Sequence, residues 1–421
     1  KNDELLDALV EAFSMSNKIE NFKDIDGFLK AKLRGGTIMG KNEQAMAIKE
    51  LQGVMVHSIL SGPKTPMRAA IGTSTLTFLN PLSRALGATV MGAKAEKQAA
   101  LAGLNAMLQT IPEAFKLFKH RLDGYWSGDI ATMNTRYMEV TKEDMQWKML
   151  GDYAMTRGTD GDKAAYIIGN IARGMNNSNL LTYSTKLMAA TDDAFRLIMA
   201  RARAREKSML KVMQEADTLE LDAKAFRKYE DDFYEKMLDP EGNIDLESDL
   251  FLQSQVKEAT LTTDLNSFAQ DFDTLFAKYP IIKPFFLFAR TGINGLAMTA
   301  KHTPLLNRTL ARTRRILRAT PDDLSEVLKD GITTAEELAS AKALIEGRQY
   351  IGAGVMILGG IAYMRGDITG NGPMNIAQKE QWEAAGWKPR SVRVGNTWVS
   401  YDSFEPFGQV ISSIADVGDN M

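Results

Sequence analysis

Hydrophobic and polar residues follow a helical period along most of the chain. Leu5, Leu9 and Phe13 show this period near the start, and residues 180–213 show it over the longest stretch. Apolar side chains that recur at about every third or fourth position line one face of an α-helix. The pattern therefore predicts a largely helical protein, with its longest helix over residues 180–213.

One segment near the C-terminal end has a different period. Residues 392–394 and 397–401 are rich in β-branched and aromatic side chains, and Gly395 and Asn396 separate them. Two such runs with a two-residue, glycine-containing loop predict a β-hairpin. No other segment has a clear strand pattern. The predicted fold class is therefore mainly α, an extended multi-helix assembly with a small β-hairpin element near the C-terminus.

Proline and glycine mark the expected boundaries. Pro81 and Pro112 lie inside helical patterns and predict breaks there, because proline lacks the N–H that a helix interior needs. Residues 370–373 form a glycine- and proline-rich elbow that cannot continue a helix. These features divide the chain into four expected regions. They are an N-terminal helical region (1–125), a central helical region (126–245), amphipathic and basic helices (246–320), and a charged helix pair, apolar helix and aromatic hairpin cap (321–421).

The charged helix pair is expected over residues 320–346. Residues 320–323 and 333–337 each place threonine ahead of acidic residues, and this arrangement caps the N-terminus of a helix. Two capped helices are therefore predicted here, one after each pattern.

An apolar run of small residues follows at 350–364 and contains Gly352, Gly354, Gly359 and Gly360. It is shorter than the roughly 20 residues that a membrane-spanning helix needs. Glycine lowers helix stability in water by up to ~1 kcal/mol relative to alanine, but its bare surface lets two backbones approach. Two interpretations remain open: a tightly packed core helix, or a membrane-active or pore-lining helix.

Aromatic side chains concentrate around the predicted hairpin, although they make up only 8% of the chain. Trp382, Trp387, Trp398 and Tyr401 lie in this stretch. Their density predicts either a small β-capped plug packed on a helix end or a surface that docks a partner.

The composition is that of a globular protein of 421 residues, with 44% hydrophobic and 25% charged side chains and a formal net charge of −2. The near-zero net charge excludes a general affinity for polyanions, so contact with nucleic acid would depend on local basic stripes. The chain has no cysteine, which excludes disulfides and thiolate metal sites. It begins with Lys1, and we expect it to be a segment or processed product of a longer polypeptide.

Two arginine-rich stretches are candidates for lining a DNA path. Three of the arginines lie on the long helix and three on a basic helix expected over residues 304–318: Arg201, Arg203, Arg205, Arg308, Arg312 and Arg315. Phosphate contact needs positive charge and no reading of bases, so such stripes suit DNA bound without sequence preference. The alternative is a solvated helix face that pairs with acidic neighbours.

The sequence contains no motif for catalysis or cofactor binding. The phosphate-binding loop, the dinucleotide-binding glycine pattern and the His-Glu-x-x-His zinc motif are all missing. The histidines His57, His120 and His302 are far apart in sequence, and we interpret His57 and His302 as structural. We therefore expect no enzymatic activity, cofactor or metal within residues 1–421, and an activity in flanking regions is left open.

Four blocks of the sequence, taken in order, carry a family resemblance. The first three are residues 58–72, residues 190–195 with their arginine-rich continuation, and residues 284–294 with 303–304. The fourth combines residues 370–373, 382–387 and 395–398 with Tyr401 and residues 405–406. In this order the blocks resemble the large internal virion proteins of short-tailed bacteriophages (podoviruses), which are core or DNA-ejection proteins.

The resemblance implies a homo-oligomeric structural protein that is stored in the virion interior, in the capsid core near the portal. On infection it would be ejected into the host cell envelope and help to form a channel, or conduit, for genome delivery. Its implied partners are other internal virion proteins, the portal, phage DNA and, after ejection, the host inner membrane. A cysteine-free helical chain with 23 methionines suits passage through a narrow tube and refolding.

Two alternatives to this role stay open. One is a virion-packaged enzyme fragment, such as a peptidoglycan hydrolase or a polymerase-associated region. The other is a portal-bound scaffold that is not ejected.

Overall fold

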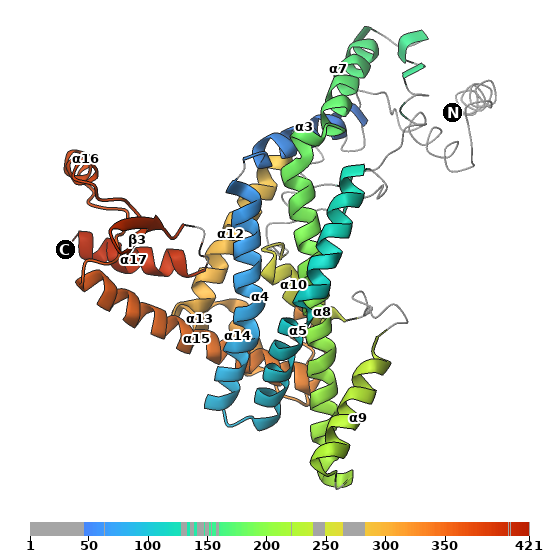
Figure 1. The fold of residues 1–421 in the computed structure, drawn as a ribbon, viewed down its shortest axis with the longest axis vertical. Helices are drawn as coiled ribbons and strands as arrows, with labels where there is room; N and C mark the ends of the chain where they lie inside the picture. The colour runs from blue at the N-terminus through green and yellow to red at the C-terminus, as the bar shows by residue number, and fades with distance from the viewer. Residues whose placement is uncertain are drawn as a thin grey trace. The chain divides into compact units, whose positions relative to one another are not determined.

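In the computed structural model, the described residues fold mainly into α-helices (Figure 1). These residues are 46–62, 64–127, 133–134, 139–140, 147, 151–152, 154–156, 160–219, 221–238, 249–263, 283–402, 404 and 406–420. Within these ranges, β-structure is confined to short antiparallel pairs, and one pair is the hairpin expected near the C-terminus. The predicted fold class is confirmed.

The helices and strands follow one another along the chain as follows. They are α3 (Met46–Leu60), α4 (Lys64–Val90), α5 (Lys94–Ser127), β1 (Met133–Asn134), β2 (Glu139–Val140), α7 (Asp160–Asn176), α8 (Asn179–Leu219), α9 (Ala223–Lys236), α10 (Leu250–Ala259), α12 (Lys283–His302), α13 (Leu306–Thr309), α14 (Ala311–Arg318), the 3-10 helix η3 (Leu328–Asp330), α15 (Ala335–Met364), α16 (Ile376–Ala384), β3 (Ser391–Val394), β4 (Thr397–Ser400) and α17 (Phe407–Asp419). Helix α8 confirms the long helix and extends past both of its expected ends.

The described residues group into two compact units. One draws them from residues 1–67, 119–190 and 264–290, and the other draws them from 68–118, 191–263 and 291–421. Each unit joins segments from more than one of the four regions expected from the sequence. The amphipathic face of a helix shows that the helix has a partner but does not identify the partner.

The first unit is centred on the packing of α3 against α7. The indole of Trp147 lies among the methyl groups of Ala47, Ala154 and Ala165. A Cβ on Gly169 would lie 2.5 Å from this ring, so α7 accepts the indole only because glycine stands there.

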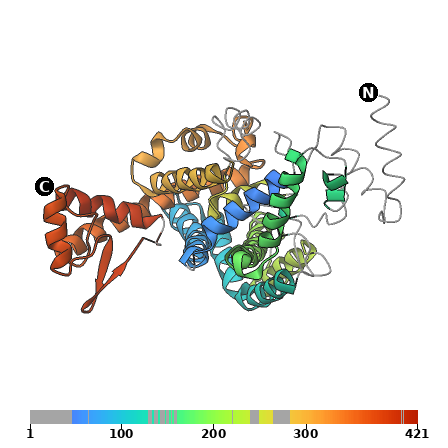
Figure 2. The same ribbon diagram turned by 90° about the horizontal axis from the view of Figure 1, so that it is seen from above.

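The second unit is a helical bundle with several apolar clusters. One cluster contains Leu338 at the start of α15 together with side chains of α10 and α14. Another gathers α4, α8, α10 and α12 around Leu252, and a third joins α5 to α8 around Ile198. In both ribbon views α17 lies beside the second half of α15, so one side of the apolar run at 350–364 packs against α17 (Figure 2).

The breaks expected at Pro81 and Pro112 are wrong. Helix α4 continues through Pro81, and α5 continues through Pro112. Proline in a helix interior removes one backbone hydrogen bond and costs about 3 kcal/mol. Contacts on both sides of Pro81 hold α4 in place, since Leu76 lies in an apolar cluster and Arg84 forms an ion pair with Glu206 of α8.

The basic helix expected over residues 304–318 is also corrected, because the structure has two helices there, α13 and α14. Leu305 has a positive φ of 66°, and Leu310 between the helices is extended. Asn307 stabilises the junction, since its side chain accepts a hydrogen bond from Thr313 and donates one to the carbonyl of Ile345.

The two capping patterns of the charged pair have different outcomes. Residues Thr320 and Asp323 form an isolated bridge, and η3 follows without the expected helix. Thr334 and Glu337 form a complete capping box, which confirms the second pattern. Helix α15 then runs without interruption from the charged segment into the apolar run.

The predicted hairpin is confirmed in position and register. Val394 of β3 lies opposite Thr397 of β4, which leaves Gly395 and Asn396 as the two-residue loop. Gly395 has a φ of +61°, a conformation that glycine adopts without strain.

Candidate functional site

Arg201 and Arg205 of α8 form ion pairs within the second unit. Arg201 reaches Glu113 of α5 at 3.3 Å. Arg205 reaches Glu230 at 2.8 Å and Asp231 at 2.6 Å, both on α9. Acidic side chains of neighbouring helices therefore already match both charges.

Arg203 lies in the interior, and its side chain is only 4% exposed. Its guanidinium reaches Asp249 at 3.1 Å and Glu337 at 2.6 Å, and it lies 4.7 Å from the centre of the Phe251 ring. Burial opposes ionisation of Asp249, but the charge of Arg203 and a hydrogen bond from Lys207 outweigh it, so the Asp249 pKa is lowered. Arg203 thus links helices from inside the bundle, and neither interpretation of the sequence anticipated this.

The three candidates of the basic segment are divided between two short helices. Arg312 and Arg315 of α14 share the carboxylate of Asp330, at 3.3 and 3.0 Å. Arg308 of α13 pairs with Glu346 of α15 at 2.9 Å, and its side chain is 56% exposed.

All six candidate arginines therefore pair with acidic neighbours in the described part of the chain. Such pairing matches the alternative to a DNA path, a helix face that pairs with acidic neighbours. Several of the pairs are nevertheless buried, which a solvated face does not require. The structure brings Arg312 and Arg315 together on one carboxylate and distributes the others over α8 and α13. A DNA-lining role for these residues stays a prediction.

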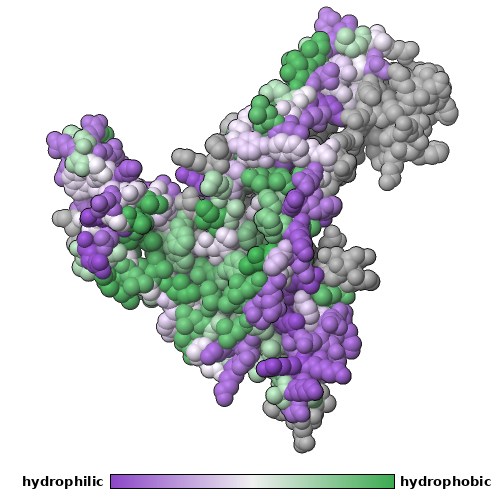
Figure 3. Space-filling view, viewed as in Figure 1, coloured by the Kyte–Doolittle hydropathy of each residue, from purple (hydrophilic) through white to green (hydrophobic). Residues whose placement is uncertain are grey.

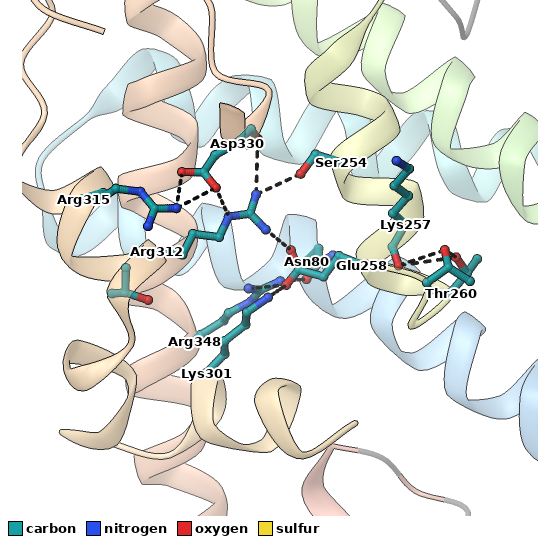
Figure 4. A network of polar contacts seen from close by, with 12 residues as sticks. Asn80, Ser254, Lys257, Glu258, Thr260, Lys301, Arg312, Arg315, Asp330 and Arg348 are labelled. Atoms are coloured by element: carbon teal, nitrogen blue, oxygen red, sulfur yellow. Dashed lines mark hydrogen bonds and ion pairs between the residues drawn. The ribbon is translucent and has the colours of Figure 1, made fainter. Parts of the chain in front are cut away.

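Among the described residues of the second unit, Glu258 of α10 pairs with basic side chains of three other helices (Figure 4). Its carboxylate lies 2.7 Å from Arg348 of α15, 2.9 Å from Lys301 of α12 and 3.9 Å from Arg312 of α14. Arg348 also donates to the side-chain oxygen of Asn80 in α4 at 2.7 Å. Figure 4 shows these side chains converging from separate helices, so one cluster fixes the relative register of α4, α10, α12, α14 and α15.

Burial and charge act against each other in this cluster. Burial favours the neutral acid at Glu258, but the charges of Arg348, Lys301 and Arg312 outweigh it and hold the pKa well below its ordinary value. Burial lowers the pKa of Lys301 to about 8, and Arg312 and Arg348 act in the same direction against the attraction of Glu258. Glu258 therefore remains ionised at neutral pH and serves as an anchor for cations.

A second buried cluster joins α4, α5, α8 and α15. Arg84 pairs with both carboxylate oxygens of Glu206, at 2.7 and 2.9 Å, and both side chains are about 95% buried. Glu96 accepts a hydrogen bond from Ser340 at 2.6 Å. Burial raises the pKa of Glu96, although the charge of Arg84 opposes this. Breaking one member of such a cluster leaves a buried charge unpaired.

Sequence reasoning missed the main members of these clusters. Glu258, Lys301 and Arg348 are separated by tens of residues, and each lies in an ordinary amphipathic pattern. Only Arg312 of the Glu258 cluster was nominated, and it was nominated for contact with DNA. No local signal distinguishes a buried ion pair from a solvated one.

The candidate glycines of α15 fall into two groups. A Cβ on Gly352 would lie 1.6 Å from the carbonyl oxygen of His302, and one on Gly359 would lie 3.4 Å from Ile414 of α17. Gly354 and Gly360 have no atom within 4 Å of that position. Gly352 therefore lets α15 approach α12 closely, whereas a methyl group at Gly359 would make only an ordinary contact with α17. Both interpretations of the apolar run stay predictions.

Three of the four aromatic candidates contact other residues of the segment 369–401. Trp382 and Trp387 meet edge to face, with ring centres 5.7 Å apart, and the Trp387 ring lies over Gly372. Tyr401 is buried, and its hydroxyl donates to the carbonyl of Thr369 at 2.5 Å. Burial raises the pKa of Tyr401 to about 12. Trp398 of β4 is partly exposed. A role for these four residues in docking a partner stays a prediction.

The histidines interpreted as structural are both inside helices and buried. His57 of α3 lies 2.8 Å from the hydroxyl of Thr185. Burial, helped by the charge of Lys186, lowers its pKa to about 4. His302 ends α12, and its ring contacts the carbonyl of Met298 and the ring of Phe407. Both side chains are neutral at physiological pH.

The second unit exposes a broad apolar surface on α4 and α15. The exposed side chains there include Leu82, Leu86 and Val90 of α4, and Ile357, Leu358, Ile361 and Met364 of α15. Figure 3 shows apolar residues gathered over these two helices on one face. The helices are in direct contact, since a Cβ on Gly347 of α15 would lie 1.6 Å from the carbonyl oxygen of Ser83 in α4.

Within the described ranges, no cluster of histidine, aspartate and glutamate side chains is arranged to hold a metal ion. Among the same residues, no helix combines the length and the apolar content that crossing a membrane requires. The buried ion clusters and the exposed apolar surface are the two features of the second unit from which a function can be argued. Comparison of the chain with protein-family models, with curated proteins and with solved structures found no match.

Proposed function

We propose that this chain is a structural protein that acts through self-association, as an internal core or ejection protein of a short-tailed bacteriophage. In this role it is stored in the capsid near the portal and is ejected into the host envelope to help form a conduit for the genome. The observation that carries the proposal is the apolar surface on α4 and α15. Large exposed apolar patches are rare on soluble monomers and mark interaction sites.

The buried ion clusters support the same role. Buried ion pairs add little net stability compared with apolar packing, but they specify which helix faces meet. Glu258 and Arg203 each join several helices in this way. A cysteine-free bundle of this kind can lose and regain its register without covalent rearrangement, which fits a protein that leaves the capsid through a narrow portal.

Self-association is tested by the mass of the purified chain in solution. We expect an oligomer for the wild type and a monomer for the double variant Leu86→Glu and Leu358→Glu, because charge placed on the apolar surface opposes its burial. The control is Leu328→Glu, since Leu328 is an exposed leucine of η3, outside α4 and α15. A monomeric wild type, or an oligomer that survives the double substitution, would contradict the proposal.

The location is tested separately by mass spectrometry of phage particles. We expect the chain in full virions, its loss from emptied capsids and its recovery in host envelope fractions after infection. Retention in emptied capsids would favour a portal-bound scaffold, and absence from virions would exclude an internal virion protein.

A further inference from the structure

A cavity of about 50 Å³ lies inside the second unit among α10, α12, α14 and α15. Its basic lining residues are Lys301, Arg312 and Arg348, and Glu258 is the carboxylate among the described residues of its wall. Asn307 adds a side-chain amide. Among the charged side chains that line this cavity, three cations therefore stand against one carboxylate.

The charges linked to this cavity do not balance. Four cationic side chains are joined to two carboxylates: Lys301, Arg312, Arg315 and Arg348 with Glu258 and Asp330. His302 also faces Arg348, but burial keeps it neutral. When the other groups are ionised, the carboxylates that the structure describes leave two positive charges of this cluster unmatched. Charge inside a protein is costly unless it is paired.

A free donor and a route from solvent accompany this excess charge. The Arg348 side chain is 4% exposed, and its Nε has no hydrogen-bond partner in the described part of the chain. Lys301 and Arg312 are 16% and 27% exposed, so they lie closer to solvent. The cavity is thus lined by a buried guanidinium that has an unused donor and by two cations that are closer to solvent.

The volume of the cavity limits what can bind. A cavity needs roughly 10–15 Å³ to hold one water, so a volume of about 50 Å³ leaves room for a small group of a few atoms. A tetrahedral oxyanion has four oxygen atoms of similar size. The cavity has no room for a strand of nucleic acid.

We propose that this cavity binds one small inorganic oxyanion, such as sulfate or phosphate, on Lys301, Arg312 and Arg348. The anion supplies the missing negative charge and accepts charge-assisted hydrogen bonds, which are about twice as strong as neutral ones. Because these three side chains come from α12, α14 and α15, the bound anion ties the helices together and stabilises the folded state. The site is independent of the proposed role in phage particles.

Calorimetric titration of the full chain with sulfate, at constant ionic strength maintained with chloride, tests this site. We expect saturable binding to the wild type and to Arg314→Gln, a control at an exposed position of the same helix. Arg312→Gln removes a charge-assisted contact and weakens binding by about tenfold or more. Equal affinity for Arg312→Gln and the wild type, or an equal response to chloride, overturns the proposal.

The pH dependence gives a second test that does not require Arg312→Gln to fold. Sulfate keeps its charge near neutral pH, whereas Lys301 has a pKa of about 8. Affinity for the wild type therefore falls as pH rises from about 7 to about 9, through the Lys301 pKa. Lys301→Arg keeps the positive charge and removes this fall. A fall that persists in Lys301→Arg, or displacement of sulfate by a short DNA duplex, overturns the assignment.

Discussion

The guanidinium of Arg203 donates to the carboxylate of Glu337 at 2.6 Å, and Glu337 also closes the capping box that begins α15. The same guanidinium reaches Asp249, the N-cap of α10, at 3.1 Å. A single side chain in the middle of α8 thus holds the first turns of two other helices. Without Arg203 the Glu337 carboxylate would be buried without a full positive charge, whereas Asp249 would keep its ion pair with Lys207.

We expect Arg203→Leu to lower the free energy of unfolding by about 3 kcal/mol, because it leaves the Glu337 carboxylate buried without its cation. Lys207 still pairs with Asp249 at 2.7 Å and moderates the loss. The control is Arg201→Leu, whose partner Glu113 is 58% exposed. An exposed pair contributes about 0–1 kcal/mol. Chemical denaturation measures both variants, and similar losses in the two would contradict the interior role of Arg203.

Replacing glycines of α15 by alanine should destabilise the protein at some positions and stabilise it at others. Gly347→Ala and Gly352→Ala place a methyl group 1.6 Å from a carbonyl oxygen of α4 or α12, so we expect a loss of about 1–3 kcal/mol or more. Gly354→Ala and Gly360→Ala meet open space. They gain helix propensity and should stabilise the protein by up to ~1 kcal/mol.

Thermal denaturation of these four single variants measures the effect. If Gly347→Ala and Gly354→Ala shift the melting temperature in the same direction, the close crossing of α4 and α15 is wrong. The comparison of Gly347→Ala with Gly354→Ala also separates helix packing from a lipid-facing role. Packing predicts opposite effects at these two positions, whereas a lipid-facing role predicts similar ones.

The buried imidazole of His302 predicts a loss of stability in acid. Burial and the charge of Arg348 lower its pKa from 6.5 to about 3, so it stays neutral in the folded protein. The unfolded chain binds a proton there below pH 6.5. Because the unfolded state binds more protons, stability is fully present above about 6.5 and falls toward pH 3, by about 1.4 kcal/mol per pH unit.

Unfolding measured between about pH 6.5 and 4.5 tests this, since carboxylates dominate below that window. We expect His302→Gln to reduce the pH slope even if it lowers stability at neutral pH. His120→Gln is the control, because His120 is exposed. An unchanged slope in His302→Gln would show that the folded protein accommodates the imidazolium.

Features with local determinants were predictable from the sequence. The hairpin turn depends on Gly395 and Asn396 themselves, and the start of α15 depends on Thr334 and Glu337, three residues apart. Both predictions were confirmed. The break expected at Pro81 was wrong because packing on either side of the proline decides the path of α4, and residues distant in sequence supply that packing.

The Glu258 cluster could not be predicted from the local sequence. Glu258, Lys301 and Arg348 meet within 2.9 Å but belong to three separate helices. Each has the spacing of a charged residue on an amphipathic helix, and that spacing does not say which charged residues are buried. The arginine-rich stretches were therefore interpreted as lining a DNA path or as forming a solvated helix face, whereas Arg203 lies inside the bundle.

The two capping patterns, at Thr320 and Thr334, have similar sequences but are predicted to contribute differently to stability. Thr334 accepts a hydrogen bond from the backbone of Glu337, and we expect Thr334→Ala to lower stability by about 1 kcal/mol, as for other lost helix caps. Thr320 has a comparable sequence context, but no α-helix follows it before η3. Thr320→Ala should therefore change stability by less than ~0.5 kcal/mol. Denaturation of both variants measures the difference. Equal losses would mean that residues 320–323 cap a helix after all, and that the two-helix unit expected from the sequence forms in solution.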